Sequence, residues 1–178
     1  MPEPFAVCFS GHRPEKLPSG SQLRMLQSLL YREIETAVRD GADTFYTGMA
    51  RGVDLWAADM VLHFRFREPE RKLKLICVLP YEQQCARMRG AARYHVQTVL
   101  HAADETVCIC RNYQKGCFTR RNQYMVDHSR RLIALVADTH SGTGQTIRMA
   151  ERQGLELRVL NTELAEKQAH PAHDFFYF

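Results

Sequence analysis

Short apolar runs alternate with longer amphipathic stretches along the whole chain. The apolar runs predict strands at residues 5–10, 43–47, 72–79, 104–110, 131–137 and 155–160. Helices are predicted over 21–41, 53–66, 119–129 and 144–153, with one or two more over 81–102. Because strand and helix alternate, the strands should lie mostly parallel, with helices on both faces of the sheet. The sequence therefore predicts a three-layer, Rossmann-like α/β fold.

The first amphipathic stretch shows the helical pattern most clearly. Leu23, Leu26, Leu30 and Ile34 recur at spacings of three or four residues, and Gly41 suits the end of the helix. The expected strands are instead apolar nearly throughout, as in RLIALVA at 131–137. Continuous apolar strands are typical of a parallel sheet that is buried on both faces.

The alternating pattern ends near residue 165. A chain of 178 residues, 45% of them hydrophobic, is long enough for one complete core. We therefore expect a single domain over 1–165 and a separate aromatic tail over 166–178, which ends in HPAHDFFYF. Such a tail can dock on the domain or meet a partner subunit, so a homodimer or a higher oligomer stays open.

Composition limits the cellular location and the binding partners that we expect for the protein. The chain has no apolar run near the ~20 residues of a membrane helix, and its N-terminus does not resemble a signal peptide. We therefore expect a cytoplasmic protein without membrane contact. Four of its six cysteines lie in or beside apolar runs, and these are expected to be free, buried thiols. The spacing of Cys108 and Cys110 does not fit a zinc site, so no metal is expected. The net charge of +4 is modest and the basic residues are dispersed, which argues against nucleic acid as a partner.

Polar or glycine-rich segments follow four of the expected strands, and ligands bind beyond the carboxyl ends of strands in a doubly wound sheet. The first segment is SGHRP. Gly11 allows a sharp turn, Ser10 offers a hydroxyl, and Arg13 offers a planar set of donors suited to phosphate. The alternative is a tight turn with an exposed arginine.

The second segment, TGMARGVD, places two glycines at the start of an expected helix. Free N–H groups and the helix dipole make such a place an anion site, formed here by Gly48, Arg51 and Gly52. Asp54 falls in the first turn, where a carboxylate suits the dipole. The segment is neither a Walker A loop nor a GxGxxG fingerprint, and the alternative is a glycine-capped loop.

The third segment, TRRN, begins the helix expected over 119–129. Arg120, Arg121 and Asn122 could reach a ligand from this position. The alternative is a solvated helix start, which is the usual role of a basic pair.

The fourth segment, SGTGQT, opens the helix that follows the strand at 131–137. Glycines, hydroxyls and a helix N-terminus together predict a phosphate cradle, although the same residues can simply cap the helix. The residues concerned are Ser141, Gly142, Thr143, Gly144 and Thr146. All four segments fall on one edge of the predicted sheet, so we expect them to surround a small phosphate-bearing ligand.

These segments contain no clear pair of nucleophile and base. Ser10 and His12 are too close in sequence to form a triad, and no carboxylate is obviously placed to orient that histidine. Asp54 and Glu151 are the remaining candidates for acid–base catalysis.

Together the segments resemble the SLOG superfamily, on the stretches SGHRPEKL (10–17), TGMARGVDLWAAD (47–59), TRRNQYMVDHS (119–129) and SGTGQTIRMAE (141–151). This Rossmann-like group includes DNA-processing protein A and the LOG-type nucleoside monophosphate phosphoribohydrolases, and the chain is most similar to its YpsA-like family. The resemblance implies a strand order of about 3-2-1-4-5. It also implies a pocket for a nucleotide or a derivative, such as ADP-ribose or an NAD-derived species. It carries over to Gly11, Arg13, Gly48, Arg51, Gly52, Asp54, Arg121, Asn122, Gly142, Thr143 and Thr146.

The last segment departs from the LOG-type hydrolases, which resemble PGGxGTxxE with a catalytic glutamate. Aligning Thr146 with their threonine places Arg148 and Met149 at the acidic positions, and Glu151 lies one helical step further on. We therefore expect a protein that binds or senses a nucleotide-like ligand. The alternative is a LOG-type hydrolase, and the third possibility is a binder of single-stranded nucleic acid.

Overall fold

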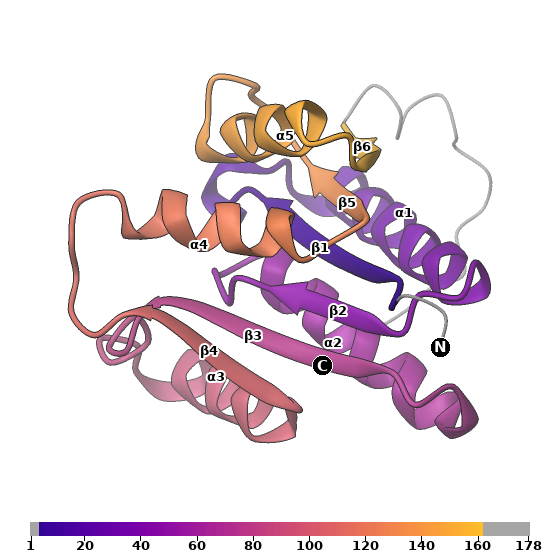
Figure 1. The fold of residues 1–178 in the computed structure, drawn as a ribbon, viewed down its shortest axis with the longest axis horizontal. Coiled ribbons are helices and arrows are strands. Elements are labelled where there is room, and N and C mark those ends of the chain that lie inside the picture. The colour runs from indigo at the N-terminus through magenta and orange to yellow at the C-terminus, as the bar shows by residue number, and fades with distance from the viewer. Residues whose placement is uncertain (1–3, 162–178) are drawn as a thin grey trace.

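A six-stranded sheet runs through the centre of the protein (Figure 1). The structure is a computed structural model that describes residues 4–161. The strands are β1 (Ala6–Gly11), β2 (Thr44–Thr47), β3 (Lys74–Tyr81), β4 (Glu105–Cys110), β5 (Arg131–Leu135) and β6 (Glu156–Leu160). The helices are α1 (Gly20–Arg39), α2 (Val53–Arg67), α3 (Gly90–Ala102), α4 (Cys117–Asp127) and α5 (Gly142–Arg152), with short 3₁₀ helices at Pro14–Lys16 and Pro69–Arg71.

All neighbouring strands are parallel, in the order β4-β3-β2-β1-β5-β6. The predicted α/β class is confirmed. The strand order agrees with the predicted order of about 3-2-1-4-5 when β4 is treated as an added edge strand beside β3, because the other five strands then follow as β3-β2-β1-β5-β6. After β4 the chain crosses back through α4 to place β5 beside β1. The strand order therefore reverses between β1 and β5, which is where ligand sites form in such sheets.

The side chains of β1, near the middle of the sheet, alternate between two apolar cores. Val7 and Phe9 of β1 point into the core beneath α1, α2 and α3. Ala6 and Cys8 of the same strand point into the core beneath α4 and α5. Figure 1 shows the helices on the two sides of the sheet. Because helices cover both faces of the sheet, residues that point to either face of a central strand are apolar, as the sequence pattern indicated.

The segment after β3 differs from the expectation. The strand runs through Pro80 to Tyr81, residues 82–87 form turns, and α3 begins only at Gly90. Pro80 is tolerated because β2 pairs with β3 only as far as Cys77, so its missing N–H interrupts no bond to that strand. These turns replace the first part of the helix expected over 81–102.

The described part of the chain contains no helix long and apolar enough to cross a membrane. Its cysteines are free; Cys8, Cys77 and Cys110 in the strands are buried, whereas Cys108 on the edge strand β4 is exposed. The aromatic tail at 166–178 and the domain end expected at 165 lie outside the described residues.

Candidate functional site

A cavity of about 340 Å³ opens beyond the carboxyl end of β1, between α4, the start of α5 and the loop after β2. We call it the edge pocket. It is lined by Phe9, Ser10, Gly11, His12, Arg13, Lys16, Ala50, Asp54, Phe118, Arg121, Asn122, Ser141, Gly142 and Thr143. The edge pocket therefore lies where the strand order reverses, in the position that a doubly wound sheet favours for a ligand.

The structure brings residues of all four polar segments together in this pocket. The predicted residues that line it are Ser10, Gly11, Arg13, Asp54, Arg121, Asn122, Ser141, Gly142 and Thr143. Four further predicted residues, Gly48, Gly52, Gly144 and Thr146, are buried and do not line it.

Three predicted residues lie on the surface outside the edge pocket. Arg51 forms an ion pair with Glu15. Arg120 donates a hydrogen bond of 3.0 Å to Gln114. Glu151 lies near the C-terminal end of α5, roughly two turns of helix beyond the pocket residues at the start of that helix.

Sequence reasoning missed His12, Lys16 and Phe118 as pocket residues. His12 belongs to the first segment, Lys16 lies two residues beyond it, and Phe118 directly precedes the third, so their position in or beside these segments was the available signal. His12 is buried, and its Nε2 accepts a 3.0 Å hydrogen bond from the backbone N–H of Asp138. Burial lowers the pKa of His12, which favours the neutral ring that can accept this bond. His12 therefore anchors the loop after β5, and that nitrogen does not act as a free base.

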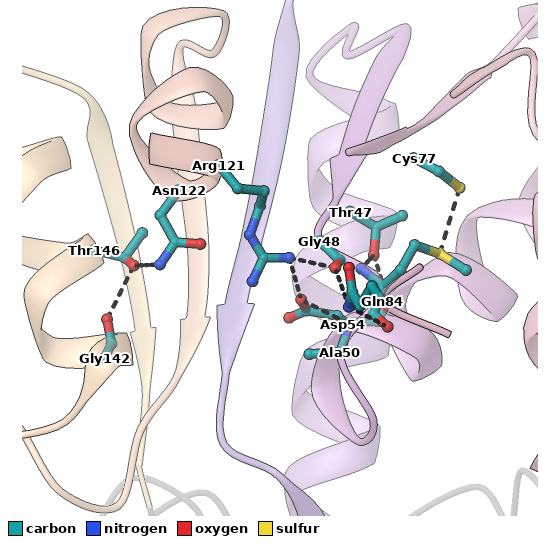
Figure 2. Close-up of polar contacts among 11 residues, drawn as sticks. Thr47, Gly48, Ala50, Asp54, Cys77, Gln84, Arg121, Asn122, Gly142 and Thr146 are labelled. Carbon is teal, nitrogen blue, oxygen red and sulfur yellow. Dashed lines mark hydrogen bonds and ion pairs between the residues drawn. The ribbon is translucent and has the colours of Figure 1, made fainter. Parts of the chain in front are cut away.

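Arg121 of α4 forms the polar centre of the site (Figure 2). Its side chain is only 7% exposed, and Nη1 donates to the carbonyl oxygen of Gly48. Nη1 also lies 3.8 Å from Oδ2 of Asp54, which accepts a 3.3 Å hydrogen bond from the N–H of Ala50. Nε of Arg121 is buried and finds no hydrogen-bond partner among residues 4–161. The guanidinium therefore keeps donor capacity beyond its contacts with the protein.

The carboxyl group of Asp54 is the counter-charge of Arg121. Burial raises the pKa of Asp54 to about 6, although the charge of Arg121 acts in the opposite direction. Burial likewise lowers the pKa of Arg121, while Asp54 raises it. An arginine stays charged in proteins, so proton uptake by Asp54 below about pH 6 leaves the pocket more positive.

The start of α5 supplies a second group of donors. Ser141 caps the helix, because its Oγ accepts a 3.3 Å hydrogen bond from the N–H of Gly144. Gly142 and Thr143, which line the edge pocket, have no carbonyl four residues back within the helix to accept their N–H groups. The predicted helix cap and the predicted phosphate cradle are therefore compatible. The cap uses the N–H of Gly144, and the cradle would use those of Gly142 and Thr143.

A side-chain contact ties α4 to α5 beside the pocket. Nδ2 of Asn122 donates to Oγ1 of Thr146 at 2.9 Å, and that hydroxyl donates to the carbonyl oxygen of Gly142 at 3.0 Å (Figure 2). Thr146 is fully buried. Although it does not line the cavity, it fixes the two helices that do.

The backbone conformation and the surroundings of Gly52 explain why the TGMARG segment ends in a glycine. Its φ of 90° is disfavoured for residues with a side chain, and a Cβ there would lie 2.7 Å from the carbonyl oxygen of His12. The glycine thus lets the start of α2 approach the loop after β1, which closes one side of the edge pocket.

No group of three or more His, Cys, Asp or Glu side chains within residues 4–161 is arranged to hold a metal ion. The cationic side chains of the edge pocket are Arg13, Lys16 and Arg121, which bind anions together with backbone N–H groups.

The sequence matches a family model described as YspA SLOG family over residues 7–162. The chain belongs to this family. The resemblance drawn from the four segments is thereby confirmed. Two relatives are UPF0398 proteins of Bacillus cereus, each 27% identical to this chain. For strain G9842 the match covers 68% of this chain and 66% of the relative, and for strain B4264 it covers 79% of each.

Two solved structures share the fold. DNA processing protein A from Helicobacter pylori, described by its single-stranded DNA binding mode, is 22% identical with a TM-score of 0.60. The match covers 92% of this chain and 73% of that protein. The molybdenum cofactor carrier protein of Chlamydomonas reinhardtii is 17% identical with a TM-score of 0.53, over 93% and 82% of the two chains.

The first of these structures corrects one prediction. Modest charge and dispersed basic residues argued against nucleic acid as a partner, and that prediction is wrong, because the fold is shared with a protein described as binding single-stranded DNA. The error arose because net charge describes the whole surface, whereas a binding site depends on the cations that the fold gathers in one place.

Proposed function

We propose that this protein binds a small phosphate-bearing ligand of the nucleotide type in the edge pocket. The observation that carries the proposal is the position of Arg121. An arginine that is 6% exposed, with a buried and unpartnered Nε, lines a cavity together with the N-terminus of α5. Buried donors without partners are costly, and an anion at this place would satisfy them.

The ligand phosphate would lie between Arg121 and the N–H groups of Gly142 and Thr143. A helix N-terminus carries a partial positive charge, and α5, with 11 residues, is long enough to supply it. Arg13 and Lys16 line the same cavity and are exposed, so they are placed to attract the anion and to cover it from the solvent side.

Hydrolysis of the LOG type is the weaker alternative. Of the two candidate carboxylates, Asp54 lines the edge pocket and Glu151 does not. A hydrolase of this kind needs an acid–base group within reach of the bond that breaks. Asp54 is already engaged by Arg121 and by the N–H of Ala50, and Glu151 is out of reach, so the geometry favours binding over turnover.

The experiment is calorimetric titration of the full chain with ribose 5-phosphate and with AMP. Arg121→Met should weaken binding of both by at least about tenfold, because a hydrogen bond to a charged group contributes about 1.5–3 kcal/mol. Arg120→Met is the matched control, since Arg120 is the neighbouring arginine of α4 and lies outside the pocket. If Arg121→Met unfolds, the exposed Arg13→Ala and Lys16→Ala variants replace it. Equal binding by all variants, or binding of neither compound, refutes the proposal.

Single-stranded nucleic acid is a second candidate, because it carries the same phosphate groups. The fold shared with the Helicobacter pylori protein and the exposed cations Arg13 and Lys16 favour it. Binding of a labelled single-stranded oligonucleotide should then weaken steeply between 50 and 200 mM salt, by roughly tenfold or more for a few phosphate contacts. Tight oligonucleotide binding without affinity for AMP would favour this candidate over a small ligand.

A further inference from the structure

A second, smaller cavity adjoins the edge pocket. It has a volume of about 190 Å³ and is lined by Arg13, Ala50, Arg51, Tyr81, Gln84, Met88 and Phe118. Arg13, Ala50 and Phe118 line both cavities, so a single ligand can occupy the two together. We call the smaller cavity the Gln84 recess.

Aromatic rings form one corner of the Gln84 recess. The rings of Tyr81 and Phe118 have centroids 6.1 Å apart and meet at 87°. Phe118 is 37% exposed, a large fraction for a phenylalanine that contacts another ring. Two rings at a right angle let a planar group stack on one of them while its edge meets the other. A flat heteroaromatic ring is therefore the chemical group that suits this corner.

Gln84 supplies the recess with a hydrogen-bond acceptor. Its Nε2 donates to the carbonyl oxygens of Gly48 and Met49, both at 3.4 Å. These two acceptors fix the orientation of the side-chain amide. Its Oε1 is then a buried acceptor without a hydrogen-bond partner among residues 4–161. The group that completes the recess should therefore be a hydrogen-bond donor.

We propose that the Gln84 recess is a nucleobase subsite, in which a base stacks on the Tyr81–Phe118 corner and donates an N–H to Oε1 of Gln84. This inference rests on the proposed function, since it places the phosphate of the same ligand in the edge pocket. It narrows the ligand from any sugar phosphate to a nucleotide or a nucleotide-containing molecule. Phe118 and Gln84 become the residues that determine specificity, and Arg121 binds the phosphate.

The test compares ribose 5-phosphate with the 5′-monophosphates of adenosine, guanosine, cytidine and uridine by calorimetry on the full chain. At least one nucleotide should bind about tenfold more tightly than ribose 5-phosphate, the gain expected from base–aromatic stacking. Gln84→Ala should remove most of this preference while leaving the affinity for ribose 5-phosphate unchanged, because Gln84 does not line the edge pocket. That unchanged affinity also shows that Gln84→Ala is folded. Phe118→Leu, at a residue that lines both cavities, should remove the preference as well.

Matched controls lie elsewhere on the described surface. Phe66→Leu changes a phenylalanine that is 87% exposed at the end of α2, and Gln83→Ala changes the exposed neighbour of Gln84; both should keep the preference. Equal affinity for ribose 5-phosphate and all four nucleotides would overturn the subsite and leave the proposed function standing. A preference that survives in both Phe118→Leu and Gln84→Ala would also overturn it. Binding of none of the five compounds would instead refute the proposed function.

Discussion

Gly48 leaves no space for a side chain at the centre of the site. A Cβ at this position would overlap Nη1 of Arg121 and lie 2.7 Å from Oδ2 of Asp54. Gly48→Ala must therefore push the guanidinium away from both the Gly48 carbonyl and Asp54. The φ of Gly48 is not positive, so the substitution acts through this overlap and not through backbone strain.

The cost follows from the buried ion pair. Removing one partner of such a pair costs about 3–5 kcal/mol. Asp54 relieves part of that cost by taking up a proton, because burial already raises its pKa to about 6. Displacing Arg121 raises this pKa further, and each unit corresponds to about 1.4 kcal/mol. A carboxyl group whose pKa is raised in the folded state stabilises that state at low pH, and this stabilisation is lost when the pH rises. We expect Gly48→Ala to lower the free energy of unfolding by about 3 kcal/mol at pH 8 and by about 2 kcal/mol at pH 5.

Urea unfolding at both pH values measures this difference. Gly142→Ala is the matched control, because a Cβ at Gly142 meets nothing within 4 Å and that glycine also has no positive φ. If Gly48→Ala is within about 0.5 kcal/mol of Gly142→Ala at pH 8, the reasoning on the buried pair is refuted.

Three further substitutions test separate parts of the site. Asp54→Asn removes a negative charge from the pocket, so ribose 5-phosphate should bind more tightly at pH 8 and show little change at pH 5; calorimetry that gives the reverse order contradicts this role. Thr146→Val breaks the bond from Asn122 and should lower the free energy of unfolding by about 1–3 kcal/mol, as urea unfolding would show. Unaltered stability would mean that this bond contributes nothing. Glu151→Ala should leave phosphate affinity and any nucleotide turnover unchanged, and loss of turnover in an activity assay would restore the hydrolase alternative.

The fold was largely predictable because its signals are local. Apolar runs such as RLIALVA are long enough to indicate buried strands, and Leu26, Leu30 and Ile34 indicate the buried side of a helix. The error after Leu79 has a tertiary cause. Pro80 normally ends a strand, and its acceptance depends on how far β2 extends beside β3, which no local pattern contains. The cytoplasmic location, the metal-free state and the role of the tail stay predictions.

The site was predictable as a set of segments but not as a set of contacts. Strand ends and glycines indicated where polar groups would gather, because the carboxyl ends of parallel strands share one edge. The sequence could not separate Arg120 from Arg121. Neighbouring helical positions differ by about 100° in direction. Only the packing of α4 decides which of the two arginines is buried against Gly48 and which pairs with Gln114 at the surface.

The position of α4 explains how distant segments form one site. It follows the edge strand β4, yet Met125 and Val126 pack into the core that it shares with α5, over the centre of the sheet. That apolar contact brings Arg121 to the loop after β2 and Asn122 to Thr146 of α5. The crossover required to reverse the strand order therefore also carries the buried guanidinium into the pocket. An anion held by both Arg121 and the start of α5 would stabilise this crossover in turn, because a ligand that binds only the folded state adds to its stability.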